Sequence, residues 1–282
     1  MISIQNVVKE LDTLKPIPEI ALRITTMAEN PQSSLSDIAH MILHDPIITA
    51  NLLKICNSAY FGFLRQIDSV HEALSLLGLR QIVDLVLLKC CAENLRKAQK
   101  GYGLHEGELF RQAVSSALIT RELAHKKKAR GKHLIFTSAL LKDIGKVVLD
   151  RFIAGSFKKI DDFVKKDGLG FREAEKKMIG IDHAEVGAML AERWSFSPKM
   201  TYIIRNHHPS AESAETDFET LIVYLADTIC VMMGIETGGG GPSCRFYEST
   251  LRRLNLSEGD IHEIILTFNK KKQKVEELPA VI

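Results

Sequence analysis

The sequence predicts an all-α protein, and three observations support this fold class. Ser or Asp is repeatedly followed three residues later by an acidic residue, a pairing that satisfies the free N–H groups of a first helical turn. Apolar residues recur at three- and four-residue steps, without the sustained two-residue alternation of a half-buried strand. Gly and Pro fall where these segments begin or end. The predicted helix starts are Ser34 with Asp37, Ser69 with Glu72, Asp182 with Glu185, and Ser257 with Asp260.

Helix boundaries follow one another along the chain. Pro31 and Pro46 mark the ends of early segments, Gly78 ends a later one, and Pro198 lies where a first helical turn would begin. Trp194 is expected to end the helix that begins near residue 183 and to anchor the core. The helical apolar steps are clearest in Ile20, Ile24, Met27; in Phe110, Ala113, Val114, Ala117, Leu118; and in Val186, Met189, Leu190.

The predicted helices fall into three regions. Residues 1–100 carry five or six short helices, and residues 101–235 carry longer ones. The run Gly238 to Gly241, followed by Pro242, cannot continue a helix. Residues 236–282 are therefore expected to form a C-terminal helical extension after a Gly-rich loop.

The composition places the chain among globular proteins. Its 282 residues are 45% apolar and 26% charged, and 37 Lys and Arg against 35 Asp and Glu give a formal net charge of +2. A disordered chain has fewer apolar residues and a larger charge imbalance. Nucleic acid and anionic lipid are usually bound by clearly basic surfaces, so neither is expected as a partner.

The sequence also predicts a cytoplasmic protein without membrane contact. It shows no secretory signal pattern, and no apolar stretch is long enough to span a bilayer. The five cysteines form no C-x-x-C pair and are expected to be reduced. One basic run is expected to be a solvated helix end, with a phosphate or nucleic-acid contact as the alternative: Lys126, Lys127, Lys128, Arg130 and Lys132.

Histidines late in the chain suggest a polar centre. His183 follows a predicted helix start, and His207 and His208 are adjacent. Asp143 precedes Lys146 by one helical turn, and a further acidic residue, at position 227, interrupts an apolar run. A carboxylate with imidazoles from other helices is how helical bundles assemble metal sites. The alternative is that such histidines cap helices or lie at the surface.

Three segments carry a resemblance to a known family. They are KPIPEIALRI at 15–24, SLSDIAHMILHDPIITANLLKICNSAYFG at 34–62 and SVHEALSLLGLRQIVDLVL at 69–87. In this order they resemble the HDOD domain, a bacterial all-helical domain distantly related to the HD phosphohydrolases and the HD-GYP cyclic-di-GMP phosphodiesterases. The resemblance covers roughly residues 12–230. It implies an N-terminal helical subdomain packed on a degenerate HD-like bundle, and a role in signal transduction with a signalling protein as partner.

The resemblance also implies which positions would hold metal in an HD enzyme. The superfamily pattern has a histidine, an adjacent His-Asp pair, a further histidine, a His-His pair and an aspartate. This sequence has, in order, Gln112, Lys142 with Asp143, His183, His207 with His208, and Asp227. Two ligand positions, Gln112 and Lys142, are lost. A protonated lysine has no lone pair and repels a divalent cation, so Lys142 is expected to replace the first metal and to pair with Asp227 or Asp143.

The second metal position keeps its ligand types. Asp143, His183, His207 and His208 could hold one Zn, Fe or Mn ion, although no cofactor is required, since the same residues could form a hydrogen-bonded polar network instead.

The function expected from these features is non-catalytic regulation through a protein partner or a small ligand, as in a pseudoenzyme of the HD superfamily. A residual one-ion phosphohydrolase or phosphodiesterase is the first alternative, with Lys142 and Lys146 neutralising phosphate charge. The second is a nucleotide sensor that binds without hydrolysis, in a pocket that includes Lys142, Lys146 and Asp227.

Overall fold

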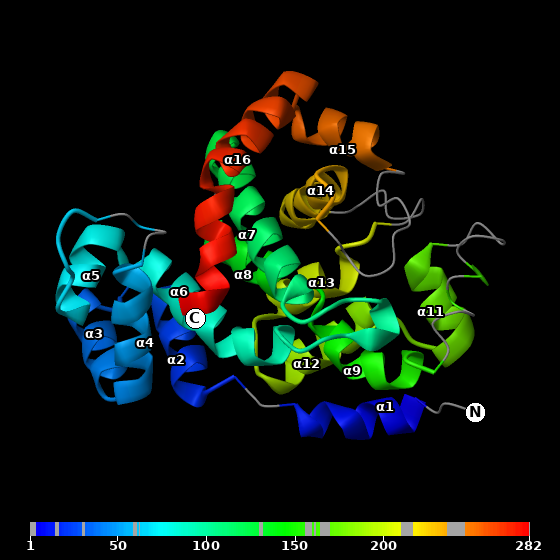
Figure 1. Ribbon diagram of the computed structural model, residues 1–282, viewed down its shortest axis with the longest axis horizontal. Coiled ribbons are helices and arrows are strands. Elements are labelled where there is room, and N and C mark those ends of the chain that lie inside the picture. Colours follow the sequence, from blue (N-terminus) through cyan, green and yellow to red (C-terminus); the bar gives the residue numbers. More distant parts are fainter. Residues whose placement is uncertain are drawn as a thin grey trace. The chain divides into compact units, whose positions relative to one another are not determined.

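The computed structural model of the chain describes residues 4–14, 17–29, 32–58, 61, 63–129, 132–155, 160, 162–163, 170–209, 217–235 and 246–281. Throughout these ranges every regular element is a helix (Figure 1), and the one β-type contact is an isolated antiparallel bridge between Gln99 and Leu104. The predicted all-α class is confirmed.

Contacts along the chain divide it into two compact units. One unit holds residues 1–15 and 94–268, and the other holds residues 16–93 and 269–282. The boundaries near residues 100 and 235 that the sequence suggests stay a prediction. The loop from Gly238 to Gly241 lies outside the described residues.

The unit built on residues 16–93 is a set of short helices. It contains α2 (Glu19–Glu29), α3 (Leu35–Leu43), α4 (Pro46–Cys56), α5 (Val70–Leu77) and most of α6 (Leu79–Leu95). Helix α3 packs against α2, α4 and α5, and its buried Ile38 and Ile42 supply the core side of those contacts. The Asn57 side chain accepts from the backbone N–H of Ile67 at 2.7 Å and donates to its carbonyl at 2.8 Å, which fixes the connection between α4 and α5.

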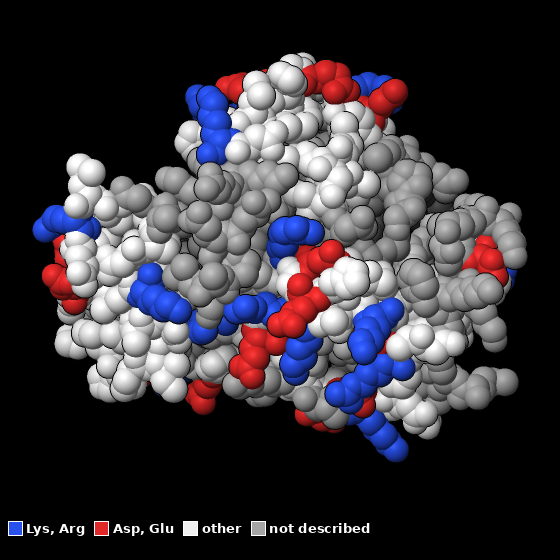
Figure 2. All heavy atoms as spheres, viewed as in Figure 1, with Lys and Arg blue, Asp and Glu red and all other residues white. Residues whose placement is uncertain are grey.

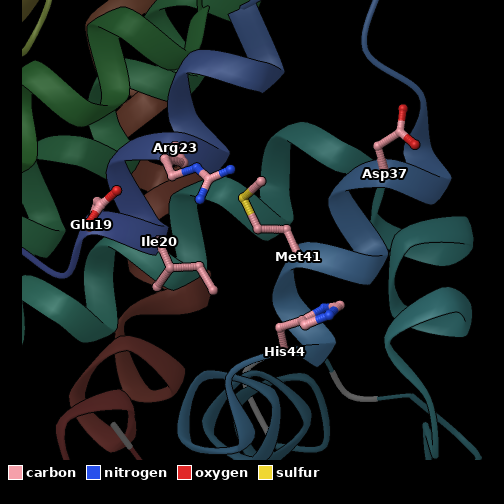
Figure 3. Close-up of a pocket in the computed structure, with 6 residues that line it drawn as sticks. All are labelled: Glu19, Ile20, Arg23, Asp37, Met41 and His44. Carbon is pink, nitrogen blue, oxygen red and sulfur yellow. The ribbon is translucent and has the colours of Figure 1, made fainter.

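A shallow hollow of about 560 Å³ opens in this unit between α2 and α3. Figure 3 shows Arg23 and Met41 pointing toward one another across it. The lining carries two carboxylates and one guanidinium, so it has no excess of positive charge with which to bind a phosphate. Its six residues are Glu19, Ile20, Arg23, Asp37, Met41 and His44.

The larger unit surrounds two long buried helices, α7 (Glu108–Lys126) and α14 (Phe218–Met232), which pack against each other. Every residue from Thr220 to Cys230 is buried, as expected for a helix enclosed on all sides. Helix α8 (Lys132–Leu141) packs against both, and α13 (Pro198–Asn206) packs against α8 and α14. Helix α12 (His183–Arg193) packs against α13 and α9 (Ile144–Ile153). The unit is completed by α1 (Ile4–Glu10), η1 (Leu11–Thr13), η2 (Lys100–Tyr102), α11 (Phe171–Ile179), α15 (Tyr247–Leu254) and the first part of α16 (Glu258–Val281), up to residue 268.

The predicted helix starts are confirmed. Ser34 with Asp37, and Asp182 with Glu185, form reciprocal capping boxes, and Ser69 accepts from the N–H of Glu72. Ser257 and Asp260 bond to each other reciprocally at the start of α16.

Prolines and the single tryptophan also bear on the predicted boundaries. Pro46 follows the end of α3, as expected, but it is also the first residue of α4, with Asp45 as its N-cap. Pro198 opens α13 and Gly78, at φ 77°, ends α5. Trp194 follows the last residue of α12 and is 8% exposed, so its role as a core anchor is confirmed.

The basic run at the end of α7 makes contacts within the molecule. Lys126 pairs with Asp260 at 2.8 Å and Glu263 at 2.6 Å on α16, and the ammonium of Lys127 donates to the carbonyl of Asn255. On the face seen in Figure 2, basic side chains lie among acidic ones. Across the part of the chain that the structure describes, no helix is long and apolar enough to cross a bilayer.

Candidate functional site

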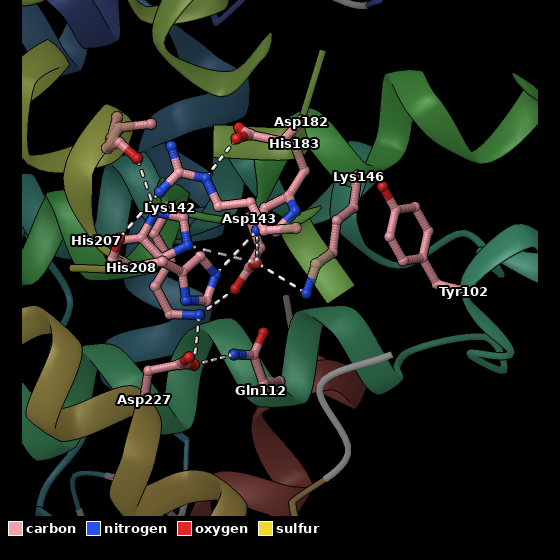
Figure 4. Close-up of polar contacts among 12 residues, drawn as sticks. Tyr102, Gln112, Lys142, Asp143, Lys146, Asp182, His183, His207, His208 and Asp227 are labelled. Atoms are coloured by element: carbon pink, nitrogen blue, oxygen red, sulfur yellow. Dashed lines mark hydrogen bonds and ion pairs between the residues drawn. The ribbon is translucent and has the colours of Figure 1, made fainter. Parts of the chain in front are cut away.

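A buried polar centre lies in the larger unit where α7, α9, α12, α13 and α14 meet (Figure 4). Lys142 and Asp143 form the turn between α8 and α9, and His183 is the first residue of α12. The eight residues singled out in the sequence all gather here: Gln112, Lys142, Asp143, Lys146, His183, His207, His208 and Asp227.

Gly145 allows α9 and α12 to approach closely enough to form the centre. A Cβ added at Gly145 on α9 would collide with the carbonyl oxygen of His183 and lie 2.7 Å from the amide nitrogen of Gly187. A Cβ added at Gly187 would instead meet the side chain of Ile204 at 3.1 Å, and it would lie at ordinary contact distance, 3.5 Å, from the carbonyl oxygen of Lys142. Backbone contact between α9 and α12 therefore places the start of α12 beside Asp143.

Lys142 joins the two aspartates of the centre. Its side chain is 1% exposed, and its ammonium forms an ion pair with Asp143 and another, at 2.6 Å, with Asp227. The Gln112 amide donates to the same Asp227 oxygen at 2.7 Å. Burial alone lowers the pKa of Lys142, but the two carboxylates outweigh burial and raise it above its usual value. The ammonium is thus a fixed internal cation, shared between α14 and the turn before α9.

Asp143 is the most heavily contacted acid of the centre. Burial alone raises its pKa, but Lys142 and Lys146 outweigh burial and hold it well below the usual value. The Lys146 ammonium lies 2.9 Å from Asp143 Oδ1 and 5.7 Å from the centre of the Tyr102 ring. Asp143 is therefore ionised and faces cations from two directions.

The three imidazoles also converge on Asp143. His183 Nε2 lies 3.5 Å from Asp143 Oδ1 and 3.1 Å from His208 Nε2, and His207 Nε2 lies 3.9 Å from Asp143 Oδ1. Burial lowers the pKa of His207 and of His208 well below its usual value. These two side chains are therefore neutral at pH 7, which is the form in which histidine binds metals.

Two observations show that the residues fit one metal ion. Ligand atoms of Asp143, His183, His207 and His208 lie within 4.8 Å of one another. The Nδ1 of His207 lies 2.7 Å from the carbonyl oxygen of Ile204, which can only accept, so Nδ1 carries the proton and Nε2 keeps its lone pair. That Nε2 atom is buried and has no hydrogen-bond partner among the described residues. The donor set suits one Zn, Fe or Mn ion.

A second ion does not fit beside the first. Protein side chains already contact the two aspartates: the Lys142 ammonium contacts Asp143 and Asp227, and the Gln112 amide donates to Asp227. A divalent cation at the same carboxylates would meet a positive charge at contact distance.

Several polar residues around the centre were not anticipated from the sequence. Glu175 on α11 is fully buried, and it contacts Tyr102 and His183. The sequence pattern could have indicated that Glu175 is buried, because Glu175 lies one helical turn before Ile179 on the same face of α11. Arg172 donates to Asp182 and to the carbonyl of His208, linking α11 to both histidine segments.

Fold and centre together define an all-helical domain with His, Asp and Lys side chains at the core of a bundle. The HDOD domain matches residues 14–210 of the 282, so the chain belongs to the HDOD family. A relative in Treponema pallidum (strain Nichols), named only as an uncharacterized protein, is 27% identical over 225 residues. The match covers 78% of this chain and 42% of that relative, so this chain spans less than half of its length.

Solved structures share the fold over nearly the whole chain. An HDOD domain protein of unknown function from Geobacter sulfurreducens has a TM-score of 0.76 at 21% identity, over 99% of both chains. A provisionally assigned phosphohydrolase from Shewanella amazonensis SB2B has a TM-score of 0.73 at 20% identity, over 98% of this chain and 97% of its own. A provisionally assigned signal transduction protein from Marinobacter aquaeolei VT8 has a TM-score of 0.77 at 21% identity, over 95% of this chain and 60% of its own.

Proposed function

We propose that this HDOD domain is a non-catalytic regulatory domain of signal transduction, which acts by binding a partner protein or a small ligand. The observation that carries the proposal is the Lys142 ammonium between Asp143 and Asp227. In this arrangement a side chain of the protein itself bridges two carboxylates that would hold a metal in an HD enzyme.

The proposal follows from what two-metal hydrolysis requires. Two ions a few ångströms apart activate a water molecule and stabilise both the attacking and the leaving oxygen. An ammonium supplies one positive charge but has no open coordination position, so it cannot generate a bound hydroxide. With Lys142 and Gln112 at the first position, the clamp on a phosphate diester is incomplete.

One ion at the second position is compatible with regulation. Asp143, His183, His207 and His208 would hold Zn, Fe or Mn, and the ion would supply a Lewis-acidic point for a phosphate or carboxylate ligand.

The names of two structural neighbours support the proposed regulatory function in part. The Marinobacter aquaeolei protein carries a signal transduction name, whereas the Shewanella amazonensis protein carries a phosphohydrolase name. The relative in Treponema pallidum is more than twice as long as the matched segment. A signalling partner, either a separate protein or a further domain of a longer chain, is consistent with these relatives.

A one-ion phosphohydrolase is the second candidate, and the intact histidine set favours it. Lys142 and Lys146 would then neutralise phosphate charge. Against it, both lysines are almost completely buried and paired with carboxylates, so their charge is already compensated.

The deciding experiment measures hydrolysis of cyclic dinucleotides and nucleoside phosphates by the wild-type protein with Mn²⁺, Fe²⁺ or Zn²⁺, together with its metal content. We expect no turnover and at most one equivalent of metal. The double variant Gln112→His with Lys142→His should bind a second equivalent, because it restores two neutral imidazole donors. Lys199→His, which adds a histidine at an exposed ion pair, is the matched control and should bind no more metal than the wild type.

Two results would overturn the proposal. The first is wild-type turnover at enzyme-like rates that Asp143→Ala abolishes. The second is two metal equivalents in the wild-type protein. Less than one equivalent with no turnover removes only the bound ion and leaves non-catalytic regulation standing.

A further inference from the structure

We propose that Glu175 is the positioning residue of the histidine site, because it fixes His183 in the tautomer whose Nε2 lone pair faces Asp143. The inference rests on the proposed one-ion site for its effect on metal affinity. The part of the inference that concerns the proton on His183 can be tested whether or not a metal binds.

Glu175 holds His183 by two bonds from one oxygen. Glu175 Oε2 accepts from the backbone N–H of His183 at 3.1 Å and lies 2.7 Å from its ring Nδ1. An ionised carboxylate can only accept, so Nδ1 must carry a proton. The remaining ring nitrogen, Nε2, then has a free lone pair in the neutral ring, and it is the atom that faces Asp143 and His208.

Tyr102 keeps Glu175 in this role from the opposite side. Its hydroxyl donates to Glu175 Oε1 at 2.5 Å. Burial, followed by the nearby Glu175 charge, raises the pKa of Tyr102 well above its usual value, so the hydroxyl stays a donor. The ring of Phe171, whose centre lies 5.4 Å from that of Tyr102, covers the pair. Both carboxylate oxygens are therefore engaged, and Glu175 has no rotational freedom.

Carboxylates outnumber ammonium groups in the centre. Leaving the imidazoles aside, the two ammonium groups of Lys142 and Lys146 face three carboxyl groups, those of Asp143, Asp227 and Glu175. A divalent ion among the imidazoles would compensate the excess. A carboxylate behind a metal-bound histidine also raises the basicity of that ligand, and removing such a partner typically costs about 10- to 100-fold in metal affinity.

A purely structural role for Glu175 makes a different prediction. In that case Glu175 only ties α11 to α12, and any residue that forms the same hydrogen bonds would serve equally well. Glu175→Gln separates the two roles, because the amide oxygen can still accept from His183 while the amide nitrogen donates to the Tyr102 oxygen. The variant keeps the bonds and removes the charge.

The experiment has two readouts on one set of proteins: wild type, Glu175→Gln, Glu175→Met and the control Glu192→Gln. Glu192 lies on α12 but pairs with Arg205 at the surface. The first readout is the ¹⁵N NMR spectrum of the histidine rings in metal-free protein at pH 7.5, which distinguishes a protonated ring nitrogen from one with a lone pair. The second is the Zn²⁺ dissociation constant, from competition with a chelating dye.

We expect wild type, Glu175→Gln and Glu192→Gln to show His183 protonated at Nδ1, with a lone pair at Nε2. Glu175→Met should shift His183 toward the Nε2–H tautomer, since an Nε2 proton can be donated to Asp143. Zn²⁺ affinity should fall about 10-fold in Glu175→Gln and about 100-fold in Glu175→Met, and stay unchanged in Glu192→Gln.

Two outcomes would overturn the inference. One is a wild-type His183 that carries its proton at Nε2. The other is wild-type Zn²⁺ affinity in a folded Glu175→Gln, which would assign Glu175 a structural role only. If the wild type binds no Zn²⁺ at all, the one-ion site of the proposed function fails, and the NMR tautomer of wild-type His183 still decides this inference. That readout does not depend on whether Glu175→Met folds.

Discussion

Removing the internal cation is the most direct test of the polar centre. Lys142→Met keeps most of the side-chain volume and leaves Asp143 and Asp227 buried without the ammonium that both contact. Two oxygens bound to one nitrogen lie on the order of 5 Å apart. At an effective dielectric constant of about 20, two unit charges at that separation repel by about 3 kcal/mol.

The expected loss of stability follows from this repulsion and from the lost ion pairs. Removing one partner from a buried ion pair typically costs about 3–5 kcal/mol, because the other charge is left uncompensated. We therefore expect Lys142→Met to lower the free energy of unfolding by about 3–5 kcal/mol at pH 7. The measurement is urea unfolding followed by circular dichroism, in buffer with EDTA.

Rescue by a divalent cation gives the prediction its specificity. The two carboxylates left by Lys142→Met would attract Mn²⁺, which at about 100 times its dissociation constant restores about 2.7 kcal/mol. Lys199→Met is the matched control, because Lys199 also pairs with two carboxylates, Asp217 and Glu219, but is 42% exposed. That control should cost about 1 kcal/mol or less and should not respond to Mn²⁺.

A small effect would refute the reasoning. If Lys142→Met and Lys199→Met lose the same stability in EDTA, the buried ammonium does not compensate the aspartates. If the loss is large but Mn²⁺ restores nothing beyond its effect on the wild type, the two carboxylates do not form a cation position.

Two further predictions concern packing and pH. Gly145→Ala should lower the free energy of unfolding in urea by about 1–3 kcal/mol and weaken Zn²⁺ binding, because its Cβ would collide with the His183 carbonyl oxygen. Gly155→Ala is the control, because the space around Gly155 is open. Equal losses in the two variants would contradict the close contact. Burial lowers the pKa of His207 and His208 well below 6.5, so the unfolded chain takes up protons there that the folded chain does not. Stability should therefore fall as pH drops below about 6.5, by up to about 1.4 kcal/mol per pH unit for each histidine; a flat profile between pH 7 and 5 would exclude this.

The helices were predictable because their signals are local. A capping residue and its acidic partner lie three positions apart, so Ser34 with Asp37 and Asp182 with Glu185 can be read without knowledge of the fold. Pro46 is the exception, because it lies between α3 and α4 and is compatible with the end of one helix and with the start of the next. Sequence alone does not show which of the two uses applies, since proline is compatible with both positions.

The residues of the centre were predictable as chemical types, and the structure brings them together. Lys142 was expected to pair with Asp227 or Asp143, and both ion pairs are present. Whether these residues bind a metal or a ligand stays a prediction. Contacts across long sequence separations were missed, such as that between Tyr102 and Glu175, because no local pattern links them.

The close approach of α9 and α12 was also missed. Gly145 and Gly187 each read as an ordinary helical glycine in the sequence, where such a residue merely weakens a helix. The importance of Gly145 appears only in the folded structure, where its missing Cβ lets the backbone of α9 touch that of α12. The geometry of the site therefore depends on a glycine without a side chain as well as on the side chains that form the site.

The cation at Lys142 differs from a bound ion in one respect that matters for the proposed regulatory function. A metal ion exchanges with the medium, so a site that holds one responds to metal supply, chelators and oxidation state. An ammonium attached to the chain does not exchange with the medium and does not respond to metal supply, chelators or oxidation state. Each copy of the protein carries one such ammonium at this position. The part of the centre that Lys142 occupies therefore does not respond to the metals around the protein, and any response to metal comes from the histidines.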